Sequence, residues 1–315
     1  MTIFIESGVT ALANVVEQDR QGWFQGHVGA SFLAGAALLD SGLLPPPAAD
    51  SLRTRLERQQ QKYHALLAPL PAGEVATDYS PILSAIARNT RQLSRSGHGV
   101  IYGALLLDTL QRTSAAVTEN AVANIARLID NCASDKWDRY AGIADYRAFR
   151  LSEPVEVDIE TLCVLAVQRS THQVYHDVDG YFLTGEKIHG VTHAHAIYLL
   201  NALGYGELAM QAASQLAVQL ALNDRLPATD VRRAQPKPFS VADAAVWADE
   251  FSDEHQIKLA YSYLDLCRKI RQPLARLDNL WGAIRNASAE RFHDAAQRRF
   301  HFMVGRGLGG MPPAR

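Results

Sequence analysis

The sequence predicts an all-α protein: one large helical domain of about a dozen helices around a central pocket lined by histidines. Three observations carry this prediction. Apolar residues recur over long stretches with the 3.6-residue period of a helix. Alternating strand patterns are almost absent, and the best of them, at 155–158, is short. Several of the 11 histidines lie inside apolar helical segments, where a polar ring needs a partner.

Three segments in the first half of the chain have a helical apolar pattern. Residues 28–39 are apolar and rich in small side chains, but this segment is shorter than the about 20 residues that cross a bilayer. Residues 48–67 place leucines on one face, opposite Arg and Gln, and residues 117–132 repeat apolar side chains at helical spacing. We expect a helix in each segment.

The second half continues the same pattern. Helices are expected at 206–223, 254–270 and 274–304, separated from one another by segments rich in Pro and Gly. We therefore predict a single domain over residues 1–304, followed by a flexible Gly/Pro-rich tail at 305–315.

Composition excludes several classes of protein. The chain has 315 residues, of which 48% are hydrophobic and 20% charged, as in ordinary globular proteins. A formal net charge of -2 argues against a nucleic-acid partner, and no signal peptide or membrane span is expected. The three scattered cysteines suggest neither a disulfide framework nor a CxxC metal motif, so we expect a cytoplasmic protein. Its apolar helices allow a homodimer, although no heptad run specifies one.

A histidine stands near the start of four apolar segments rich in small residues. These histidines are His27, His98, His189 and His255. Small neighbours let backbones and a ligand approach closely, and neutral imidazole binds iron, zinc and copper. We predict that four helices bring these rings to one metal site. The alternative is that each ring is packed in the core with one nitrogen bonded to a carbonyl.

Spacing along each helix refines this hypothesis. His189 and His193 are four residues apart and share a face, whereas His195 points to another side, toward either a substrate or the next helix. His255 and Lys258 also share a face. Lys258 has two alternatives: it turns outward as a solvated ammonium, or it is desolvated and its amine reacts with carbon dioxide to form a carbamate ligand.

Two other interpretations compete with this site. His172, the pair His176–Asp177 and the pair His293–Asp294 could belong to an HD-type metal-dependent hydrolase. However, His176–Asp177 runs directly into a segment that is typical of a turn. The second alternative is a helical small-molecule-binding protein without catalysis, in which the histidines are only core residues.

The four histidine segments resemble the motifs of the questin oxidase-like family. The most specific is Asp-Glu-His-Gln-Ile-Lys-Leu at 253–259, which matches the family's Asp-Glu-His-x-Ile-Lys-Leu. Residues 26–33, 97–104 and 188–196 are similar to the other three motifs, with Gly26 where the family usually has Asn. Together the motifs span most of the chain.

This resemblance implies an all-α oxygenase or oxidase that acts with O2 on a small aromatic or quinone-type substrate in natural-product metabolism. It also implies a mononuclear non-haem Fe(II) held by His27, His98, His189 and His255, with Lys258 as a candidate carboxylated lysine. The expected chemistry is oxidation or cleavage of an aromatic ring.

Further residues near these motifs are candidates for contact with the substrate. Tyr102 and His193 are each one turn after a candidate ligand, and we expect them to touch the substrate or to support the ligands. Trp23 and Phe24 precede His27 and would either wall an aromatic substrate or form part of the core.

Overall fold

Four helices form a ring at the inside of this protein, and the other helices cover it. The computed structural model describes residues 2–133, 148–151, 158–177, 182–224, 231–233, 235–248 and 254–287. Its elements are α1 (Thr2–Gln18), α2 (Gly26–Asp40), α3 (Pro46–Lys62), α4 (Ser80–Asn89), α5 (His98–Thr113), α6 (Glu119–Cys132), α7 (Ile159–His172), α8 (Phe182–Ala202), α9 (Gly206–Asn223), α10 (Ala244–Ala248), α11 (Glu254–Lys269) and α12 (Asp278–Ala287), the 3-10 turns η1 (His64–Leu67) and η2 (Arg95–Gly97), and the strands β1 (Tyr175–Asp177) and β2 (Val231–Arg233).

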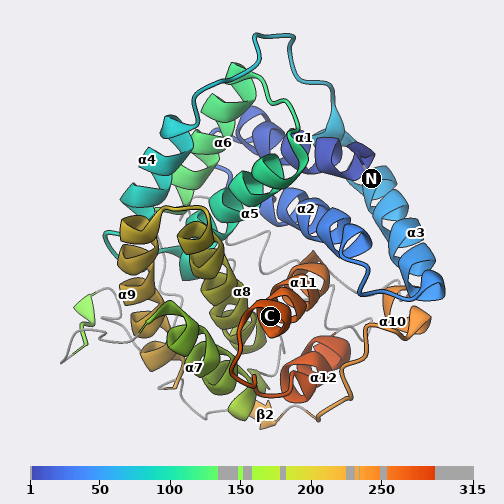
Figure 1. Ribbon diagram of the computed structural model, residues 1–315, viewed down its shortest axis with the longest axis vertical. Coiled ribbons are helices and arrows are strands. Elements are labelled where there is room, and N and C mark those ends of the chain that lie inside the picture. Colours follow the sequence, from blue (N-terminus) through green and yellow to red (C-terminus); the bar gives the residue numbers. More distant parts are fainter. Residues whose placement is uncertain are drawn as a thin grey trace, which may run out of the picture.

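The inner ring consists of α2, α5, α8 and α11, each of which packs against the next, with α11 closing back onto α2. Figure 1 shows α11 near the centre of the molecule, with α2, α5 and α8 around it. Helices α1, α4 and α6 cover one side of the ring, and α7 and α9 cover another. The predicted all-α class and the expected number of helices are confirmed. Histidines from all four inner helices meet inside this ring, whereas the pocket expected there stays a prediction.

Helix α2 is inside because its sequence leaves it no polar face. Every residue from Gly26 to Leu38 is buried, as expected for a helix that is apolar on all sides. Helices α6 and α4 have one apolar and one polar face, and they lie in the outer layer. Within the described ranges, none of the helices combines the length and apolarity that a membrane span requires.

Close approach of α1 and α2 depends on glycine. A Cβ atom at Gly29 would lie 2.6 Å from Cγ of Leu12 and 2.7 Å from the carbonyl oxygen of Gly8. Real Cβ contacts are not this short, so a side chain at Gly29 would force the two helices apart. The small residues of the first histidine segment therefore set the position of α2 against the outer layer.

Several predicted boundaries differ from the structure. The helix expected at 274–304 begins only at Asp278, where the backbone carbonyl accepts a hydrogen bond from Lys237 N–H and the carboxylate accepts one from Phe239 N–H. The segment 48–67 divides at Tyr63 into α3 and η1. Residues 152–157, 288–304 and the proposed tail lie outside the described residues.

Replacing Gly29 with alanine should destabilise the fold by about 1–3 kcal/mol, because the added methyl group overpacks the contact between α1 and α2. Urea unfolding followed by circular dichroism measures this loss. Gly206→Ala is the matched control, since a Cβ there would meet only Oδ1 of Asn201 at 3.6 Å. Equal stability of Gly29→Ala and wild type would contradict the close approach.

Candidate metal centre

The four candidate histidines come from the four helices of the inner ring. His27 is the second residue of α2, His98 the first residue of α5 and His255 the second residue of α11. His189 differs from the expectation, because it lies well inside α8 rather than at its start. Helix α8 begins seven residues before His189, so this ring reaches the other histidines from the middle of a helix and not from its first turn.

The structure brings these four rings together. The ring centroids of His27 and His98 are 4.6 Å apart, those of His98 and His189 are 4.2 Å apart, and those of His27 and His255 are 4.2 Å apart. All four side chains are buried, with at most 4% of their surface exposed. One ligand nitrogen each from His27, His98 and His189 lies within 4.8 Å of the others, so this group could hold a metal ion.

Two of these rings are in direct polar contact, with Nε2 of His27 2.9 Å from Nε2 of His98. In the protein alone this is a hydrogen bond in which one ring donates and the other accepts. Two nitrogens that bind one ion at right angles, each about 2.1 Å from it, would be about 3.0 Å apart. The same arrangement therefore suits neighbouring ligands of a six-coordinate ion.

Lys258 also lies in this cluster. It is one turn after His255 on α11, it is 1% exposed, and its Nζ contacts Nδ1 of His27. The solvated outward orientation is therefore wrong: apolar helices surround this side chain. Burial lowers the pKa of His27 well below its usual value, and the charges of Lys258 and His255 lower it further. His27 is therefore neutral near pH 7, which is the form that binds metals.

Aromatic side chains stand around the histidines. The ring of Trp23 meets His98 edge-on at a centroid distance of 5.0 Å, and that of Phe24 meets His27 at 4.8 Å. Tyr102 is fully buried, 5.8 Å from His27. A Cβ at Gly26 would lie 2.5 Å from Cε2 of Tyr102, so glycine at this position makes room for the tyrosine ring.

His193 is directed away from the cluster. Its Nδ1 donates to Oε1 of Gln219 at 2.9 Å, and its ring lies against Gly97. Within the described residues, Nε2 of His193 has no hydrogen-bond partner. Burial lowers the pKa of His193 to about 4, despite the opposing effect of the hydrogen bond that it donates to Gln219. His193 is thus a buried neutral base next to the residue that precedes His98, not a member of the histidine group.

His195 faces the next helix, which resolves the alternative left by the sequence. Its Nε2 lies 2.9 Å from Oδ2 of Asp265, and its Nδ1 lies 3.1 Å from the hydroxyl of Ser262. Sequence reasoning missed both partners on α11. The sequence did contain a signal for a polar face on this helix. Its polar residues recur at spacings of four and three, at Lys258, Ser262 and Asp265, and so share one face.

Of the side chains in the HD-type alternative, the structure describes that of His172. His172 is exposed at the end of α7, and His176 and Asp177 lie in β1, which pairs with β2. The described residues contain one group of metal-ligating side chains, and it is the histidine group above. The pair His293–Asp294 lies outside the described residues.

No family model, curated protein or solved structure matches this chain.

The stability of the metal-free protein should fall between about pH 6.5 and pH 4. In this range the unfolded chain protonates His193, whose ordinary pKa is 6.5, while the folded chain does not until about pH 4. The stabilising contribution is therefore fully present above pH 6.5 and is lost as pH falls, by up to about 3 kcal/mol. Urea unfolding at a series of pH values measures this slope.

The variant His193→Gln should show a shallower dependence, because its side chain does not titrate. His64→Gln is the control, since His64 is exposed and should leave the dependence unchanged. If the free energy of unfolding depends on pH equally in wild type and in His193→Gln, folding does not lower the pKa of His193.

Proposed function

We propose that this protein is a non-haem iron enzyme, an oxygenase or oxidase that uses O2 to oxidise or cleave a small aromatic or quinone-type molecule. Fe(II) would bind between His27, His98, His189 and His255. The observation that carries the proposal is the convergence of four buried imidazoles from four different helices, with three ligand nitrogens within 4.8 Å of one another.

The burial of the four histidines favours a metal site over the alternative that their rings are only packed in the core. Each buried imidazole gives up its contacts with water at a cost in free energy, so packing alone does not favour four of them in contact. A cation at their centre gives every nitrogen lone pair a partner. Neutral rings are also what a metal needs, and the lowered pKa of His27 keeps that ring neutral.

The choice of iron rests on Lys258 and on the questin oxidase-like motifs. Imidazoles alone bind zinc, copper, nickel and iron, so the histidines do not select the metal. If the buried amine of Lys258 attacks carbon dioxide and releases a proton, the resulting carbamate supplies an anionic oxygen beside the histidines. A set of imidazoles plus one hard oxygen anion suits Fe(II).

The surroundings of the site support an aromatic substrate. Trp23, Phe24 and Tyr102 make T-shaped contacts with the histidines, so aromatic rings border the cluster and could pack against an aromatic substrate. Bound iron would supply one-electron chemistry and the activation of O2, while the chain orients the substrate and excludes water. Tyr102 is proposed to contact the substrate or the ligands, and His193, which lies against Gly97 beside His98, to support the ligands.

Metal analysis tests the central claim. Wild-type protein loaded with Fe(II) without oxygen should retain about one iron per chain after gel filtration. The double variant His98→Ala with His255→Ala should retain less than about a tenth of this amount, because it lacks two ligands. His172→Ala is the control, because that histidine is exposed at the end of α7 and lies outside the histidine group, and it should keep the iron. A wild-type protein that binds no transition metal, or a double variant that keeps it, overturns the proposal.

Lys258 has its own test. Lys258→Ala should lose most of the iron, and bicarbonate with a short carboxylic acid should restore part of it by supplying the missing oxygen anion. Lys187→Ala is the matched control, since Lys187 is also buried on a ligand-bearing helix but donates to the carbonyl of Arg169. If Lys258→Ala holds iron as wild type does, the carbamate ligand is wrong.

A further inference from the structure

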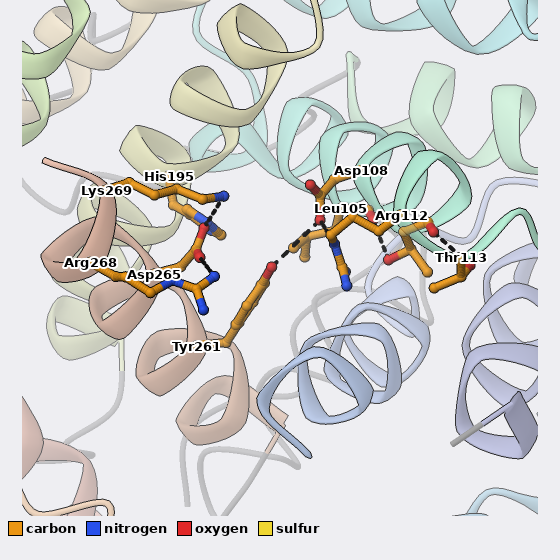
Figure 2. A network of polar contacts seen from close by, with 10 residues as sticks. Leu105, Asp108, Arg112, Thr113, His195, Tyr261, Asp265, Arg268 and Lys269 are labelled. Carbon is orange, nitrogen blue, oxygen red and sulfur yellow. Dashed lines mark hydrogen bonds and ion pairs between the residues drawn. The ribbon is translucent and has the colours of Figure 1, made fainter. Parts of the chain in front are cut away.

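A second polar layer lies beside the histidine cluster and connects three of the four ligand-bearing helices. Its centre is Asp265 on α11, which is 2% exposed. The carboxylate accepts from His195 Nε2 at 2.9 Å, from Lys269 Nζ at 2.7 Å and from Arg268 NH2 at 3.0 Å. Figure 2 shows these side chains converging on Asp265, with His195 reaching across from α8.

The same layer reaches α5 through Tyr261. The hydroxyl of Tyr261 lies 3.5 Å from Oδ2 of Asp108, and Arg112 Nε donates to the same oxygen at 2.8 Å. Burial raises the pKa of Tyr261, and the nearby carboxylates raise it further, so the phenol keeps its proton and can donate. The ring of Tyr261 also packs edge-on against His195, at 5.1 Å.

We infer that Asp265 is a positioning residue for the metal centre, where it fixes α8 against α11 and thereby sets the separation of His189 from His255. This inference rests on the proposed function. Asp265 does not touch the cluster itself, so it acts on the metal site only through the helices that it joins.

Helix geometry supports this role. His195 is six residues after His189, about 9 Å further along α8, and its partners Ser262 and Asp265 are seven and ten residues after His255, about 10.5 and 15 Å further along α11. Both helices therefore meet first at the histidines and again at Asp265, in the same order along the chain. Two contacts at different heights fix the angle between the helices as well as their distance.

The charge of Asp265 strengthens the contact between the two helices. Burial alone would raise the pKa of Asp265, but His195 and Lys269 outweigh burial and hold it well below its usual range. Asp265 is therefore ionised and attracts donors from both helices.

Cobalt(II) binding tests this inference without a known substrate. Asp265→Asn keeps the shape of the side chain but removes its charge, so the affinity for Co(II) should fall about ten- to hundredfold. The visible absorption of the Co(II)-saturated variant should differ from that of wild type, because the ligands occupy different positions. Tyr261→Phe is a milder change that should shift the Co(II) affinity and the absorption in the same direction. It takes the place of Asp265→Asn in this test if Asp265→Asn does not fold.

A variant that destabilises the fold away from the ligand-bearing helices separates positioning from general stability. Asn14 is buried on α1, outside the ligand-bearing helices, and donates to the carbonyls of Leu66 and Ala68. Asn14→Ala should lower the melting temperature but leave the Co(II) affinity and spectrum unchanged.

The outcomes separate this inference from the proposed function. If wild type binds Co(II) and both Asp265→Asn and Tyr261→Phe keep its affinity and spectrum, only the positioning role is wrong. If Asn14→Ala weakens Co(II) binding as much as Asp265→Asn, the effect is one of general stability and the positioning role is again overturned. A wild-type protein that binds neither Co(II) nor Fe(II) overturns the proposed function and, with it, this inference.

Discussion

The burial of four imidazole rings and one lysine inside a ring of four helices is the constraint on which the rest of the structure depends. Removing these polar groups from water costs free energy that their contacts with one another only partly return. Burial lowers the pKa of His27, and the charges of Lys258 and His255 lower it further, so this ring is uncharged near pH 7. A neutral imidazole is the form that can bind a metal cation, so the desolvation that costs the fold free energy also favours the form that a metal would need.

The small residues of the histidine segments serve this arrangement at particular contacts. Gly26 leaves room for the ring of Tyr102, Gly97 lies directly against the ring of His193, and Gly29 lets α2 approach α1. A side chain at any of these positions would displace a ring or a helix next to the cluster. The glycines near the histidines are thus requirements of packing around the centre, and they explain why this chain has glycine at position 26.

The two polar layers of the inner ring have opposite electrostatic character. In the described residues the group that could hold a metal ion contains only histidines, whereas the layer around Asp265 holds a buried anion whose partners Arg268 and Lys269 extend toward solvent. The separation keeps this carboxylate away from the nitrogens of the histidine group, where it would favour their protonation. The histidine group and the ionic layer that joins the helices lie about 9 to 15 Å apart along the same helices.

The sequence alone determined what depends on local periodicity. It predicted the all-α class, the bounds of α9, those of α11 to within one residue, and the four histidines that converge. Only the tertiary structure decided the partners of individual side chains: His195 faces Asp265, and Lys258 meets His27 across 231 positions of the chain. A helical period shows which residues share a face but not which helix that face meets. A charged residue such as Asp265 is expected at the surface until a partner from another helix makes its burial favourable.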